Sequence, residues 1–182
     1  MATEWINVVD SAVKIGLGAL ISGVFTYLGL KFKSSSENQR FMLENKAKIL
    51  EEVSSDIHDY FIAWRFYISI ISGITKRKAL AGKDGSDFAE KERSSIIERN
   101  NDLVDAWPKR ESAISKLILL KATNVADAIS ECGELEAELR SQIIFDKKVP
   151  LDAAVKDYST RVKAQIKVVN NELAKFYSTL NA

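Results

Sequence analysis

Apolar side chains recur in steps of three and four residues over most of the chain after position 50, which is the spacing of one helix face. The first series consists of Leu50, Val53, Ile57, Tyr60, Trp64, Tyr67, Ile71 and Ile74. The last series consists of Leu151, Val155, Tyr158, Val162, Val169, Leu173, Phe176 and Leu180. Each series predicts a long helix that buries one face.

Turn-forming residues divide this pattern into segments. The glycines in 82–85 predict the end of the first helix, and Asp87-x-x-Glu90 resembles a capped start of the second. Pro108 predicts a kink or break in that second helix, because its ring removes a backbone hydrogen bond. A third helix is expected over about 124–145 and a fourth after Pro150. No stretch alternates with period two long enough to predict a strand. Residues 34–182 therefore predict an all-α fold, an antiparallel bundle of about four long helices.

The N-terminal part of the chain has a different pattern. Sixteen residues between Lys14 and Lys31 carry no charge, and four of them are glycine. With residues 11–14 included, a helix at about 1.5 Å per residue covers a hydrocarbon core of about 30 Å. A cleaved signal peptide fits less well, because Glu4 and Asp10 precede the apolar run. A buried helix of a soluble protein also fits poorly, because such a helix should show charge on one face. Residues 1–33 therefore predict a single transmembrane anchor with a short N-terminal tail.

Small residues follow two stripes along this predicted membrane helix. One stripe contains Ala12, Gly16, Ala19, Gly23 and Thr26. The other contains Ser11, Gly18, Ser22 and Gly29. Small side chains let membrane helices approach closely, so either stripe favours a homo-oligomer. Stripes on two faces also permit a ring, although glycine is frequent in membrane helices generally.

Residues that flank the run predict its placement in the bilayer. Trp5 and Tyr27 suit the two interfaces, and the stem of Lys14 can extend toward the nearer one. Lys31 and Lys33 follow the run and add to the positive charge on that side. The positive-inside tendency then predicts an outside N-terminus and a cytoplasmic bundle in contact with membrane lipid. The size, the few loops and the lack of a cleaved signal suggest a bacterial inner membrane.

Residues 60–74 are apolar nearly all round, with Arg65 as the only charge. A second membrane segment is one interpretation, but the stretch covers only about 22 Å and a central arginine costs about 2.5 to 3.5 kcal/mol. A buried central helix, or one whose extra face meets a neighbouring subunit or a partner, fits better. Phe61, Arg65, Phe66 and Ile68 are the candidate contact residues.

Composition and charge add few signs of chemistry. Lys and Arg number 26 and Asp and Glu 25, a net charge of +1 that argues against general nucleic-acid binding. Cys132 is the only cysteine, so it has no internal disulfide partner, and its position in the seam predicts a core residue.

We interpret His58 as a polar group at the edge of the bundle. Glu131, Glu134 and Glu138 share one helix face but lack the histidine of a Glu-x-x-His metal pair, so a solvated face is favoured. We therefore predict no catalytic site, no cofactor and no metal.

These features predict a non-enzymatic membrane protein that acts by homo-oligomeric assembly. A pore-forming or membrane-perturbing effector or accessory protein fits this description. The alternative is a passive tether or adaptor, whose bundle binds a cytosolic protein while the anchor only localises it.

Overall fold

The computed structural model describes residues 37–179, with side chains over residues 41–178. The described part is all-α, which confirms the predicted fold class for this region. Its elements are α2 (Glu37–Leu80), α3 (Glu90–Asp105), α4 (Trp107–Leu119), α5 (Thr123–Arg140), the π-helical turn η2 (Ser141–Phe145) and α6 (Asp152–Thr179).

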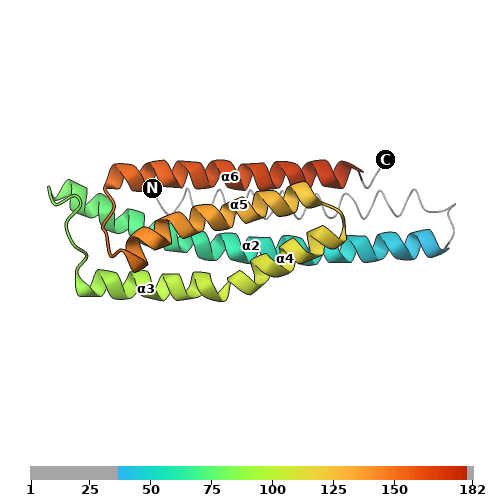
Figure 1. Cartoon of the computed structure of the whole chain (residues 1–182), viewed down its shortest axis with the longest axis horizontal. Helices are drawn as coiled ribbons and strands as arrows, with labels where there is room; N and C mark the ends of the chain where they lie inside the picture. The colour runs from blue at the N-terminus through green and yellow to red at the C-terminus, as the bar shows by residue number, and fades with distance from the viewer. Residues whose placement is uncertain (1–36, 180–182) are drawn as a thin grey trace.

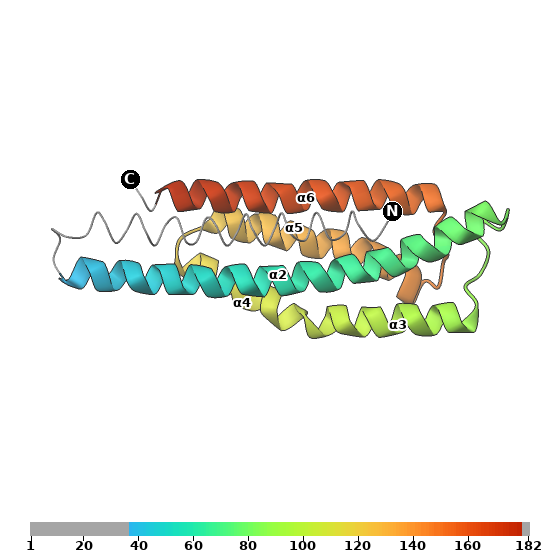
Figure 2. The same cartoon turned by 180° about the vertical axis from the view of Figure 1, so that it is seen from behind.

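The helices form an elongated antiparallel bundle (Figure 1). The chain runs one way along α2, returns along α3 and α4, runs forward again along α5 and returns along α6. Helix α2 contacts α3, α4 and α6, and α5 contacts α4 and α6. Figure 2 shows the same arrangement from behind, with α3 at the outside of the bundle next to α2.

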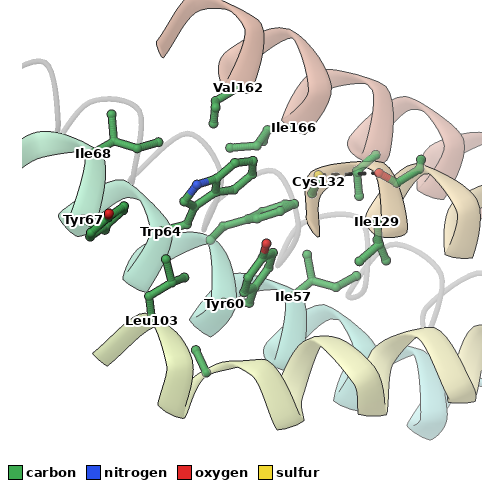
Figure 3. Packing of buried hydrophobic residues seen from close by; sticks show 14 of the residues in the cluster. Ile57, Tyr60, Trp64, Tyr67, Ile68, Leu103, Ile129, Cys132, Val162 and Ile166 are labelled. Carbon is green, nitrogen blue, oxygen red and sulfur yellow. Dashed lines mark hydrogen bonds between the residues drawn. The ribbon is translucent and has the colours of Figure 1, made fainter. Parts of the chain in front are cut away.

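The predicted seams form the core. All eight members of the first series, from Leu50 to Ile74, are buried. Figure 3 shows the indole of Trp64 pointing toward Val162 and Ile166 of α6, so this seam meets the seam of the last helix. The last series is buried at Val155, Tyr158, Val162, Val169 and Leu173. Phe176 is only partly buried, Leu151 precedes α6 and is exposed, and Leu180 lies outside the described residues.

Helix α2 ends where the glycines predict. Gly82 has a φ of 69°, the left-handed conformation that glycine adopts without steric cost. The Lys83 amide donates to the Lys78 carbonyl at 2.8 Å, and the Gly82 amide donates to the Ala79 carbonyl at 3.1 Å. These two bonds are the pair of a Schellman cap. Asp87 does not cap α3 as predicted, since the capping position is Ala89, whose amide donates to the Glu92 carboxylate at 3.0 Å.

Pro108 divides α3 from α4, as predicted. Helix α3 ends at Asp105, and Pro108 lies in the first turn of α4, where a missing amide proton breaks no helical bond. Helix α4 ends with a second Schellman pair, in which the Ala122 amide donates to Leu117 at 2.9 Å. Its left-handed residue is Lys121, with a φ of 62°, which no sequence signal indicated.

Among residues 37–179, no helix combines the length and apolarity that crossing a membrane requires. Residues 60–74 lie in the C-terminal half of α2, where Tyr60, Trp64, Tyr67 and Ile71 are fully buried. The buried-helix interpretation of this stretch therefore holds. The predicted anchor, residues 1–33, lies outside the described residues.

Candidate functional site

The four residues predicted to meet a subunit or partner have different environments. Phe61 and Ile68 are buried, and Arg65 is partly buried. Phe66 is 50% exposed and lies at a groove between α2 and α3. The contact itself stays a prediction, and Phe66 is its most accessible member.

The groove has a volume of about 480 Å³. Helix α2 contributes Phe66, Ser69, Ile70, Gly73 and Arg77 to its lining, and α3 contributes Arg99. A methyl group added at Gly73 would meet no atom within 4 Å, so the groove floor is open at that position. The groove therefore has an apolar floor with two guanidinium groups beside it.

Acidic neighbours hold both arginines at the groove. The Arg99 guanidinium lies 5.9 Å from the centre of the Phe66 ring, and its Nη1 is 2.8 Å from Asp102 Oδ2. Arg77 Nη2 lies 3.9 Å from Glu92 Oε1. An apolar side chain accompanied by a carboxylate suits such a surface, because the ring and Ile70 offer apolar area while the arginines offer N–H donors.

A second feature, a buried polar cluster around Glu136, lies inside the bundle. Glu136 belongs to α5 and is only 2% exposed. The Tyr60 hydroxyl donates a hydrogen bond to Oε2 at 2.8 Å, and the Trp107 indole N–H donates to Oε1 at 2.8 Å. Burial, and then the charge of Glu136, raises the pKa of Tyr60 above its ordinary range, so this hydroxyl remains a donor.

Two arginines complete the Glu136 cluster. Arg110 Nη1 lies 3.3 Å from Oε2, and Arg140 Nη1 lies 3.7 Å from Oε1. Arg140 also donates through Nε to Asn100 Oδ1 at 2.8 Å, and its guanidinium stacks 4.6 Å from the centre of the Trp107 ring. The cluster thus joins α2, α3, α4 and α5. Both carboxylate oxygens of Glu136 are occupied by donors from the protein, which suits a structural role.

Sequence reasoning missed this cluster, although one signal was present. Glu136 lies four residues after Cys132 and three before Leu139, both buried, so it occupies a core position of α5. A charge at a core position requires a partner, because an unpaired buried charge is costly. The partners come from other helices, so their identity could not be read from spacing.

The three glutamates of α5 lie on the exposed face that the sequence predicts. Glu131, Glu134 and Glu138 are exposed, and Glu138 forms two hydrogen bonds with Arg161 of α6, at 2.8 and 2.7 Å. Among residues 37–179, no group of three metal-ligating side chains converges. His58 is partly buried.

Cys132 is fully buried, as a core residue should be. Burial raises the pKa of its thiol to about 12. The thiol donates to the Ala128 carbonyl at 3.5 Å (Figure 3). A buried thiol with so high a pKa is a poor nucleophile, which agrees with a packing role.

The predicted membrane residues lie outside the described part of the chain. These are the packing residues Ala12, Gly16, Gly18, Ala19, Ser22, Gly23 and Gly29, and the interface residues Trp5, Lys14, Tyr27, Lys31 and Lys33. Their roles stay predictions.

Comparisons of the chain with protein-family models, with curated proteins and with solved structures find no significant match.

Proposed function

We propose that this chain is a non-enzymatic membrane protein whose helical bundle acts by assembly with further copies at the membrane. The observation that carries the proposal is the uncharged run between Lys14 and Lys31, with small residues on two faces. The run ends shortly before α2 begins at Glu37, so the bundle would continue directly from an anchor. The positive charge after the run favours a cytoplasmic bundle.

The buried chemistry of the bundle suits this role better than catalysis. The Glu136 carboxylate accepts from Tyr60 and Trp107 and faces Arg110 and Arg140. A buried acid held in this way orders the helices around it and has no oxygen left for a substrate. An assembled ring of such bundles could open or perturb the bilayer, as a pore-forming effector does.

The experiment that tests the proposal is the mass of the full-length protein in mild detergent. We expect a discrete oligomer of the wild type and smaller species of Gly16→Leu and Gly23→Leu, because leucine separates helices that pack through glycine. Val24→Leu is the matched control, because Val24 lies on the helix face away from both stripes, and it should leave the mass unchanged. A wild-type monomer would overturn the proposal.

A second candidate function, an adaptor that binds a cytosolic protein, is favoured by the α2–α3 groove. Its exposed Phe66 and two arginines suit an apolar side chain with a carboxylate. If this is the function, an unrelated membrane helix in place of residues 1–33 should leave function intact. Phe66→Ser should then abolish function, whereas Ile97→Ser should not. Ile97 on α3 is similarly exposed, at 52% against 50%, and does not line the groove.

A further inference from the structure

Helix α3 lies at the outside of the bundle and packs mainly against one neighbour, α2 (Figure 2). Among its 16 residues three are buried, Ile96, Asn100 and Leu103, whereas α5 buries eight of 18. Figure 3 shows Leu103 on the side of α3 that faces α2. Helix α4 also buries few residues, but it contacts both α2 and α5. Of the described helices, α3 is therefore the one that is held mainly from a single side.

The contact between α3 and α2 is incompletely filled. The α2–α3 groove lies along it, and a methyl group added at Gly73 would meet no atom within 4 Å. Atoms that line such a gap lose the dispersion contacts that a packed interface supplies. Asn100 also places a polar group between Ile96 and Leu103 on the buried stripe of α3. Its Oδ1 accepts a hydrogen bond from Arg140 Nε at 2.8 Å, and water can replace this bond when the helix moves away.

Both ends of α3 meet short segments that can act as hinges. Before α3, residues 81–89 contain Gly82 and Gly85, which have φ values of 69° and 73°. After it, Ala106 is the single residue between α3 and α4. Pro108, in the first turn of α4, cannot donate the backbone hydrogen bond that would continue α3. Hinges of moving segments are a few residues of this kind, in loops or at the ends of elements.

We propose that α3 is a lid, which swings away from α2 as one unit about residues 81–89 and Ala106. The structure shows the closed form, in which the bundle core covers one side of α2 and the lid covers another. This arrangement accounts for the apolar side chains on nearly all sides of residues 60–74. In the open form, the groove at Phe66 and Ile70 extends into the surface that Ile96 and Leu103 otherwise cover. The inference concerns a single chain and goes beyond the proposed assembly.

Hydrogen–deuterium exchange of the full-length protein in detergent, followed by mass spectrometry, tests the inference. A detached helix of this length is marginal in water, so its amides lose protection whenever the lid opens. We expect the amides of α3 to exchange together, about a hundredfold faster than those of α5 and of residues 60–74 in α2. Exchange of α3 at the same rate as these segments would overturn the inference, because α3 would then open only when the whole bundle unfolds.

A chemical lock shows whether fast exchange comes from movement of α3 away from α2. Arg77→Cys and Glu92→Cys, in a Cys132→Ser background, are joined by a short bifunctional maleimide, since the two native side chains approach to 3.9 Å. The matched control lock joins Asp59→Cys to Lys109→Cys, at an ion pair between α2 and α4. Each double variant before joining is its own reference.

The lock between α2 and α3 should slow exchange of the α3 amides about tenfold, and the control lock should leave it unchanged. If neither lock slowed α3, or if both slowed it equally, α3 would fray in place instead of swinging as a unit, and the lid would be ruled out. Neither result depends on the mass of the full-length protein, so failure of the lid and failure of the proposed assembly are distinguishable.

Discussion

Gly133 and Gly73 both lie inside helices, but their surroundings differ. A methyl group added at Gly133 of α5 would come within 2.8 Å of Arg110 Nη1, the arginine that faces Glu136. The same methyl group at Gly73 of α2 would meet no atom within 4 Å. One glycine borders the closed Glu136 cluster and the other borders the open α2–α3 groove.

The difference separates two roles that polar residues take in this bundle. At the Glu136 cluster, arginines from α4 and α5 face the buried Glu136 carboxylate, and Arg140 also donates to Asn100. At the groove, Arg77 and Arg99 stand beside exposed apolar surface that solvent can reach. The cluster therefore holds the helices together, whereas the groove leaves Phe66 and its two arginines accessible. Stability should be sensitive to substitution in the first region and tolerant in the second.

Thiol reactivity should show the largest contrast. With a pKa of about 12, Cys132 is ionised to about one part in ten thousand at pH 8, whereas an exposed cysteine with a pKa of about 8.5 is roughly a quarter ionised. Alkylation of native Cys132 should be at least a thousandfold slower than that of Phe66→Cys in a Cys132→Ser background, as followed by mass spectrometry. Comparable rates would mean that the interior around Cys132 opens readily.

The same thiol gives a pH dependence with a defined sign. Its folded-state pKa lies above its ordinary value, so its contribution to stability is complete below about pH 8.5 and is lost as the pH rises toward 12. The midpoint of urea unfolding should therefore fall less steeply over this range in Cys132→Ala than in the wild type.

Glu136→Gln should have the largest effect on stability. It removes the charge that balances Arg110 and Arg140, and breaking a buried pair typically costs about 3 kcal/mol. Unfolding by urea, followed by circular dichroism on the full-length protein in detergent, measures the loss. Glu134→Gln, on the exposed face of the same helix, should stay within about 0.5 kcal/mol. If Glu136→Gln and Glu134→Gln lowered the free energy of unfolding equally, the cluster would have no special role in stability.

Tyr60→Phe and Tyr67→Phe form a second pair. Tyr60 donates to Glu136, and losing a hydrogen bond to a charged group costs about 2 kcal/mol. The Tyr67 hydroxyl is buried and has no hydrogen-bond partner within residues 37–179, so its removal should cost nothing or stabilise the fold slightly. Urea unfolding followed by circular dichroism compares the free energies of unfolding of the two variants. A loss in Tyr67→Phe as large as in Tyr60→Phe would contradict the assignment of the cluster's donors.

The two glycines give the smallest effects, with opposite signs. Gly73→Ala should stabilise the protein by about 0.5 to 1 kcal/mol, because alanine has the higher helix propensity and space is available. Gly133→Ala gains the same propensity but displaces Arg110, so we expect a net loss of about 1 kcal/mol. The difference between the two unfolding free energies is the measurement. Equal stabilisation by both would show that Arg110 moves away without cost.

The sequence by itself determined the helices and most of their ends. The three-and-four spacing of Leu50 to Ile74 identified the buried face of α2, because helical periodicity is a property of consecutive residues. Gly82 and Pro108 marked an end and a break for equally local reasons, a left-handed conformation and a missing amide proton. Phe66 was identified as a candidate contact, although the sequence did not separate it from buried Phe61.

Only the tertiary structure decided which residues meet. The Glu136 cluster joins residues of α2, α3, α4 and α5, and the hydrogen bond from Tyr60 to Glu136 alone spans 76 positions of the chain. Lys121 adopts a left-handed conformation because the Schellman turn between α4 and α5 requires one there. The groove between α2 and α3 brings Gly73 and Phe66 of α2 together with Arg99 of α3, which lie far apart in the sequence. Spacing along a chain sets which face a residue occupies, but packing between helices sets what that face touches.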